Sequence, residues 1–138
     1  MIKKFVPYWD KNKRDLENYF RANPQSEYDS YEKLVKQLFR YVINPNAELG
    51  QDFSLVIHAI DDGNYSGTLL FLIHRDSYQP EAQDYVMTYV DYGSCSGCDT
   101  LLSISKYGSG LPSEEQVSDY MTLCLHLFQH LIYPFKKD

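Results

Sequence analysis

The sequence predicts an α+β domain in which a three-stranded antiparallel β-meander packs against helices. Apolar residues recur at helical spacing in the first third of the chain and again near its end. Between these regions, three apolar stretches are separated by short segments rich in Asp, Gly, Asn and Pro, which is typical of strands joined by turns. With 138 residues and no long linker, the chain is expected to form a single domain over residues 1–138.

The N-terminal region is expected to form an arm followed by a helix. Residues 1–9 are interpreted as an arm or a short strand. Asp10 can cap a helix over residues 11–22, because its carboxylate accepts hydrogen bonds from the free N–H groups of a first turn. Asn23-Pro24 ends this helix, since a residue before proline disfavours helical geometry.

A second helix is expected to complete an N-terminal helical hairpin. Either Ser26 or Ser30 can cap it, and the apolar residues from Tyr31 to Val42 fall on one broad helical face. The tripeptide Asn44-Pro45-Asn46 ends the helix.

Three strands are predicted at residues 53–60, 67–74 and 85–92. The segment Asp61-Asp62-Gly63-Asn64 has strong turn chemistry, so the first two strands should form a hairpin. The second strand is apolar almost throughout, which predicts a central strand covered on both faces.

The long C-terminal helix, expected after Ser113, has the clearest start signal in the chain. Ser113 and Gln116 have the spacing of a capping box, and Glu114 and Glu115 suit the positive end of the helix dipole. Pro134 is expected to end this helix. The preceding stretch, residues 100–107, is a short element of ambiguous type.

The pair Cys95-x-x-Cys98 is the most specific chemical feature. Two thiolates on a tight turn are half of a tetrahedral zinc site. His126 and His130 lie four positions apart on the C-terminal helix and share a face, so the candidate zinc ligands are Cys95, Cys98, His126 and His130. Cys124 points to another side of that helix, so the alternative is an incomplete set of three cysteines on the core face. More simply, Cys124 is expected to be a small core residue.

The same turn allows three other interpretations. A cysteine at the start of a helix has a stabilised thiolate and could belong to a redox pair. Alternatively, the backbone N–H groups around Gly93, Ser94, Ser96 and Gly97 could bind an anion. Finally, the turn could be needed only for packing, in which case the protein has no cofactor.

Composition favours a protein partner. The formal net charge is −6, so a nucleic-acid backbone would be repelled, and an acidic surface that meets a basic site is favoured. There is no apolar run of about 18 residues and no export signal, which predicts a cytoplasmic protein without a membrane span. The 13 tyrosines suit an interface with a partner or a homodimer.

The segment Tyr92-Gly93-Ser94-Cys95-Ser96-Gly97-Cys98-Asp99-Thr100-Leu101, followed by residues 116–123 and 125–127, resembles small uncharacterised proteins encoded by bacteriophages and prophages of Gram-positive bacteria. The resemblance covers about the last third of the chain. It implies a phage accessory protein in the host cytoplasm. Small acidic proteins of this kind often inhibit a host enzyme or defence complex, so we expect a non-enzymatic inhibitor of a host defence or nucleic-acid-handling protein. The alternative is a metal- or thiol-dependent protein that uses Cys95 and Cys98.

Overall fold

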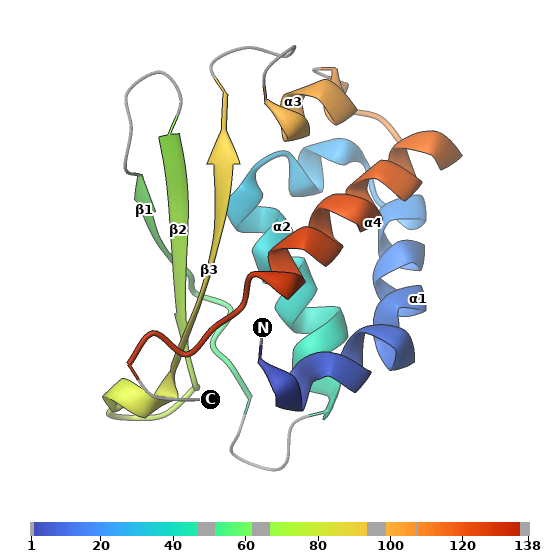
Figure 1. The fold of residues 1–138 in the computed structure, drawn as a ribbon. Helices are drawn as coiled ribbons and strands as arrows, with labels where there is room; N and C mark the ends of the chain where they lie inside the picture. The colour runs from blue at the N-terminus through green and yellow to red at the C-terminus, as the bar shows by residue number, and fades with distance from the viewer. Residues whose placement is uncertain (1, 47–51, 62–66, 94–98, 107, 136–138) are drawn as a thin grey trace.

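The chain forms an α+β fold, as the sequence predicts. The computed structural model describes residues 2–46, 52–61, 67–93, 99–106 and 108–135. A three-stranded antiparallel sheet, in the order β1-β2-β3, stands beside the helices (Figure 1). The α-helices of the described chain all lie on one side of this sheet, so its other face is left without a helical cover.

Helix α1 (Val6–Ala22) begins earlier than predicted. The predicted arm or strand at residues 1–9 is wrong, because Lys3–Phe5 form a 3₁₀ turn that leads directly into the helix. Pro7 explains the early start, since proline suits the first helical turn, where its missing N–H has no partner to lose. Asp10 consequently lies inside the helix instead of capping it.

Helix α2 (Tyr31–Leu38) confirms Ser30 as the cap, because the Ser30 hydroxyl accepts a hydrogen bond from the backbone N–H of Lys33. The helix continues as a π-helical turn at Phe39–Ile43. The side chain of Asn12 in α1 donates to the carbonyl of Val42 over 3.1 Å, which ties the two helices together. The predicted helical hairpin is therefore present.

Strands β2 (Gly67–His74) and β3 (Tyr85–Tyr92) begin and end where they were predicted. Strand β1 (His58–Asp61) is shorter than the predicted strand at residues 53–60. The Ser54 hydroxyl accepts a hydrogen bond from the backbone N–H of Val56, and a side chain that binds nearby backbone in this way competes with a strand ladder. Before that turn, Phe53 forms only an isolated bridge with Arg75.

Strand β2 is central, but in the part of the chain that the structure describes helices cover only one of its faces, so the prediction of two covered faces is wrong. Phe71 and Ile73 point to the helices and are buried. Leu70 and Leu72 alternate with them, point to the opposite face and are only half-buried.

Helix α3 (Thr100–Ser105) resolves the ambiguous stretch, and Asp99 caps it. Helix α4 (Glu114–Gln129) has the predicted capping box, with both of its hydrogen bonds present between Ser113 and Gln116. The predicted helix end at Pro134 is wrong, because α4 ends at Gln129 and the chain beyond it pairs Ile132 with Met87 at the free side of β3.

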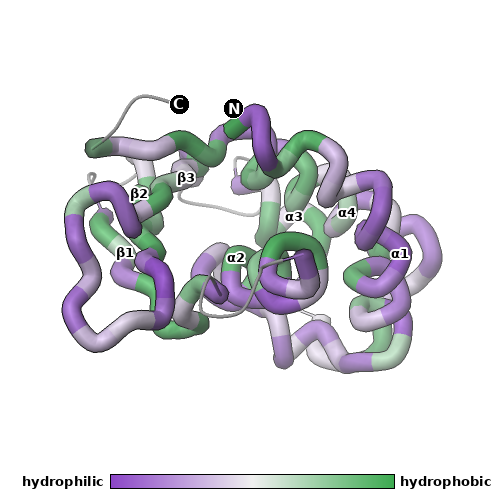
Figure 2. Tube along the Cα trace, turned by 90° about the horizontal axis from the view of Figure 1, so that it is seen from below, coloured by the Kyte–Doolittle hydropathy of each residue, from purple (hydrophilic) through white to green (hydrophobic). Residues whose placement is uncertain are grey.

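The core lies between the sheet and the helices. In Figures 1 and 2, α2 lies nearest the sheet and α1 farthest from it. Cys124 is fully buried, which confirms it as a core residue. An aromatic cluster joins α1 to α4, in which the Phe20 ring centroid lies 5.5 Å from that of Tyr120 and 4.8 Å from that of Tyr28.

Candidate functional site

A cavity of about 400 Å³ opens at the end of the sheet, where α2 and α3 begin. We call it the Asp99 cavity. Its walls come from the start of α2, the helix-facing side of the sheet and the start of α3. The lining residues are Asp29, Ser30, Tyr31, Glu32, Ala59, Leu69, Phe71, Tyr92, Gly93, Asp99, Leu101 and Leu102.

Asp99 is buried and organises one wall of the cavity. Its Oδ1 atom accepts hydrogen bonds from the Tyr31 hydroxyl at 3.0 Å and from the Gly93 N–H at 3.1 Å. Its Oδ2 atom accepts one from the Leu102 N–H at 3.0 Å. The Leu101 N–H donates to the Tyr31 hydroxyl oxygen at 3.1 Å. A buried carboxylate needs donors of this kind, so the network fixes α2, β3 and α3 relative to one another.

The burial of Tyr31 has a chemical consequence. Removal from water raises the pKa of its phenol well above the ordinary value, so the hydroxyl stays protonated and remains a donor to Asp99.

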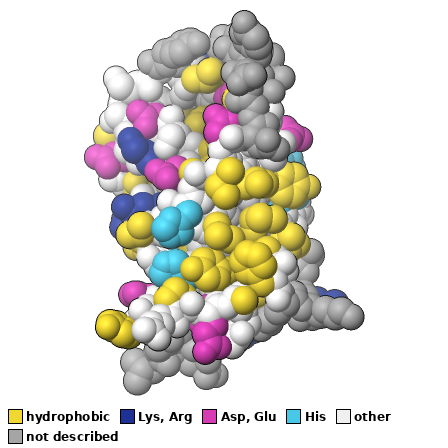
Figure 3. Space-filling view, turned by 90° about the vertical axis from the view of Figure 1, so that its left-hand side faces the viewer, with side chains coloured by type: hydrophobic (Ala, Val, Ile, Leu, Met, Phe, Trp, Pro, Cys, Tyr) yellow, Lys and Arg dark blue, Asp and Glu magenta, His cyan; other side chains and the backbone are white. Residues whose placement is uncertain are grey.

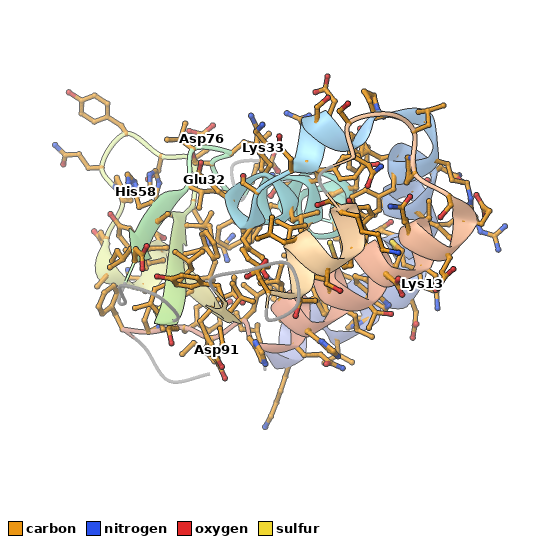
Figure 4. All side chains as sticks on the ribbon, turned by 90° about the horizontal axis from the view of Figure 1, so that it is seen from above. Lys13, Glu32, Lys33, His58, Asp76 and Asp91 are labelled. Atoms are coloured by element: carbon orange, nitrogen blue, oxygen red, sulfur yellow. The ribbon has the colours of Figure 1, made fainter. Side chains whose placement is uncertain are left out.

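The charged side chains that line the Asp99 cavity are all acidic. They are Asp29, Glu32 and Asp99, and no Lys, Arg or His is among the described lining residues. Lys33 offsets Asp29 through an ion pair of 2.8 Å. Glu32 has no hydrogen-bond or ion-pair partner within the described chain, and Figure 4 places it between α2 and the strands. The cavity is therefore suited to a ligand with positive charge.

The predicted anion site falls partly on this wall. The Gly93 N–H is already bound to Asp99, so this donor is committed within the protein. Ser94, Ser96 and Gly97 lie outside the described residues. Anion binding by the turn thus stays a prediction.

The predicted zinc ligands are only partly described. Cys95 and Cys98 lie outside the described residues. His126 is exposed near the end of α4, and His130 follows the last residue of that helix. The described residues contain no group of three or more His, Cys, Asp or Glu side chains that could hold a metal. Zinc binding, like redox activity of the cysteine pair, stays a prediction.

His130 has a defined environment that the sequence did not indicate. Its ring stacks on Tyr89 with a centroid distance of 4.3 Å and an interplanar angle of 3°. Its Nδ1 atom lies 3.1 Å from the Tyr89 carbonyl oxygen. A carbonyl can only accept, so Nδ1 carries the hydrogen and Nε2 of the neutral ring is left as an acceptor or ligand.

Cys124 has no part in such a site. Burial raises the pKa of its thiol, which keeps it protonated and disfavours both metal binding and nucleophilic chemistry.

A second surface lies on the side of the sheet away from the helices. We call it the outer face. The strand register places its residues in cross-strand rows, with Ile132 and Phe135 adjoining β3. Its members are His58, Ile60, Thr68, Leu70, Leu72, His74, Tyr85, Met87, Tyr89, Asp91, Ile132 and Phe135.

The outer face is strongly apolar. Figure 3 shows hydrophobic side chains gathered in one area over the sheet, with histidine side chains beside it. Ile60 is 52% exposed and Phe135 is 58% exposed. A hollow of about 550 Å³ indents this face between His58, Leu72, Ala82, Tyr85 and Phe135. The continuous apolar run of β2 is the sequence signal for this surface, but the same run also predicts a strand that is covered on both faces.

No protein-family model, curated protein or solved structure matched the chain. Within the described residues, no helix has both the length and the apolar character to cross a membrane.

Proposed function

We propose that this protein is a non-enzymatic binding protein that docks, through its outer face, on a basic site of another protein. The observation that carries the proposal is the exposed apolar side of β2 and its neighbours. Single exposed apolar residues are ordinary, but a contiguous apolar area on a sheet is typical of an interaction site.

The composition of the outer face supports a protein partner. The row Ile60, Leu70 and Tyr89 crosses all three strands, and Met87 and Ile132 extend the neighbouring row. Aromatic residues and methionine are enriched at the centres of protein interfaces. The stacking of Tyr89 on His130 also orders an anchor residue before binding, which lowers the entropy lost on association.

The charge around the outer face supports a basic partner. Figure 3 shows acidic side chains above and below the apolar area. The strand register places Asp91 on the outer face opposite Thr68, whose hydroxyl donates to the Asp91 Oδ1 atom over 3.0 Å. A partner with lysine or arginine around an apolar centre would be attracted and oriented by this border. Under the expected phage origin, that partner is a host defence or nucleic-acid-handling protein.

The experiment compares two double variants, each of which replaces two exposed apolar side chains with serine. Ile60→Ser with Tyr89→Ser removes apolar groups from the outer face, whereas Val56→Ser with Leu111→Ser removes exposed apolar groups elsewhere. Each protein is used to capture partners from a Gram-positive host lysate, and the captured protein is then purified and titrated. We expect the outer-face variant to bind about tenfold more weakly or worse, as for the loss of interface anchors, and the other variant to bind as the wild type does.

Equal affinity of both variants would contradict the proposal. So would a wild-type protein that captures nothing. Sedimentation of the purified proteins tests the predicted homodimer. A wild-type dimer that becomes a monomer in the outer-face variant would show that the face binds a second copy of the chain, which would overturn the proposal.

A further inference from the structure

We propose that the Asp99 cavity binds an arginine side chain presented by a protein. This site is separate from the outer face, because its sheet residues Ala59, Leu69 and Phe71 belong to the helix-facing side. The inference therefore does not depend on the proposed docking through the outer face.

The walls of the cavity suit the stem of an arginine. Leu69, Phe71 and Leu101 provide apolar surface, and Ala59 leaves space beside them. The methylene groups of an arginine gain free energy when they pack on such surface while the charged end stays at a polar border. The volume of about 400 Å³ is ample for one such side chain.

The polar groups suit the guanidinium. The Glu32 carboxylate forms no ion pair with any described residue, and the charge of Asp29 is partly neutralised by its ion pair with Lys33. The hydroxyl of Tyr92, a lining residue, donates a hydrogen bond to Asp61, so the Asp61 carboxylate also lies beside the cavity. A guanidinium is planar, weakly hydrated and able to form paired hydrogen bonds with a carboxylate, which makes it a better match than a lysine ammonium.

Two helices begin at the cavity, and free helix N-termini would favour an anion. Several of the backbone donors at the cavity are already occupied. The N–H groups of Gly93 and Leu102 bind Asp99, and that of Leu101 binds Tyr31. At the start of α2, the Lys33 N–H binds the Ser30 hydroxyl. The full charges on the described lining are those of the carboxylates, and these favour a cation over an anion.

The test uses N-acetyl-arginine amide as the probe and follows the backbone amide NMR shifts of the full chain. N-acetyl-citrulline amide has nearly the same shape without the charge and is the control ligand. We expect the arginine probe to shift the amides of Glu32, Gly93 and Leu102 in a saturable way, with an affinity that falls as salt is added. The citrulline probe should bind at least threefold more weakly, the size expected for an exposed ion pair.

Matched variants localise the site. Glu32→Gln removes a charge without changing shape and should weaken the arginine probe roughly threefold. Ala59→Phe should fill the cavity and abolish binding, whereas Ile60→Phe, on the other face of the same strand, should leave it unchanged. Thermal unfolding of each variant establishes that it is folded.

Several results would overturn the inference. They are equal binding of the two probes, shifts that map away from the cavity, or unchanged binding in a folded Ala59→Phe protein. Inorganic phosphate that shifts the same amides more strongly would show an anion site instead. The Ile60→Ser, Tyr89→Ser protein should still bind the arginine probe, so failure of this inference and failure of the proposed function are distinguishable.

Discussion

The Tyr31 hydroxyl donates a hydrogen bond to Oδ1 of Asp99 over 3.0 Å, although the two residues lie 68 positions apart in the chain. This contact joins the first turn of α2 to the cap of α3. Because the same phenol oxygen accepts the N–H of Leu101, Tyr31 serves as both donor and acceptor within one buried network.

Replacing Tyr31 with Phe should destabilise the fold by about 1–3 kcal/mol. The substitution keeps the ring but leaves the Leu101 N–H and one lone pair of Asp99 without their buried partner. Urea unfolding measures the change. Tyr78→Phe is the control, since this ring is 97% exposed and the same substitution there should cost almost nothing. Equal stabilities of the two variants would show that the network contributes little.

Replacing Thr88 with Val should destabilise the packing of α4 on the sheet by about 1–3 kcal/mol. The Thr88 hydroxyl is buried and donates to the Leu127 carbonyl over 2.7 Å, so valine would preserve the shape but leave that carbonyl unpaired. Thr122→Val removes an exposed hydroxyl from the same helix and is the matched control. Thermal unfolding should separate the two variants by several degrees. Indistinguishable midpoints would contradict the prediction.

Stability should fall in the alkaline range. Burial raises the pKa of Tyr120 to about 12 from its ordinary value of 10.0, and it also raises the pKa values of Tyr28 and Tyr31. Below about pH 10 these phenols are protonated in both states, so their stabilising effect is complete. Above it, the unfolded chain ionises first and the folded state loses stability as pH rises toward 12. Ultraviolet titration of tyrosinate should show a late group of phenols that ionises together with unfolding. A single uniform titration near pH 10 would contradict this.

Cys124 should resist thiol reagents in the native protein. Its side chain is fully buried and its thiol has a raised pKa, so reaction requires opening of the core. The clean measurement uses the Cys95→Ser, Cys98→Ser protein, in which Cys124 is the remaining cysteine. Mass spectrometry should detect modification in urea and almost none in native buffer. Equal rates in the two conditions would contradict the structure of the core.

Local signals explain which elements could be predicted from the sequence. The capping box at Ser113 and the bounds of β2 and β3 depend on neighbouring residues, and the structure confirms them. The shortening of β1 depends on how Ser54 binds nearby backbone, which the alternation of apolar residues does not reveal.

The surfaces were harder to predict because they depend on distant contacts. The Asp99 cavity combines residues from α2, all three strands and the start of α3, and no local pattern brings these together. Asp99 itself, followed by a short apolar stretch, has the pattern of a helix cap, and this was the signal that could have pointed to it. The position of the outer face depends on which side of β2 the helices pack against, and an apolar strand alone does not indicate that side.

The most direct test of docking through the outer face is amide hydrogen exchange of the protein with and without its purified partner. If the outer face is the docking surface, binding should slow exchange at residues 58–61, 67–74 and 85–91 and leave the exposed side of α1 unchanged. Protection confined to α1 or to the exposed side of α4, with the sheet unaffected, would contradict it.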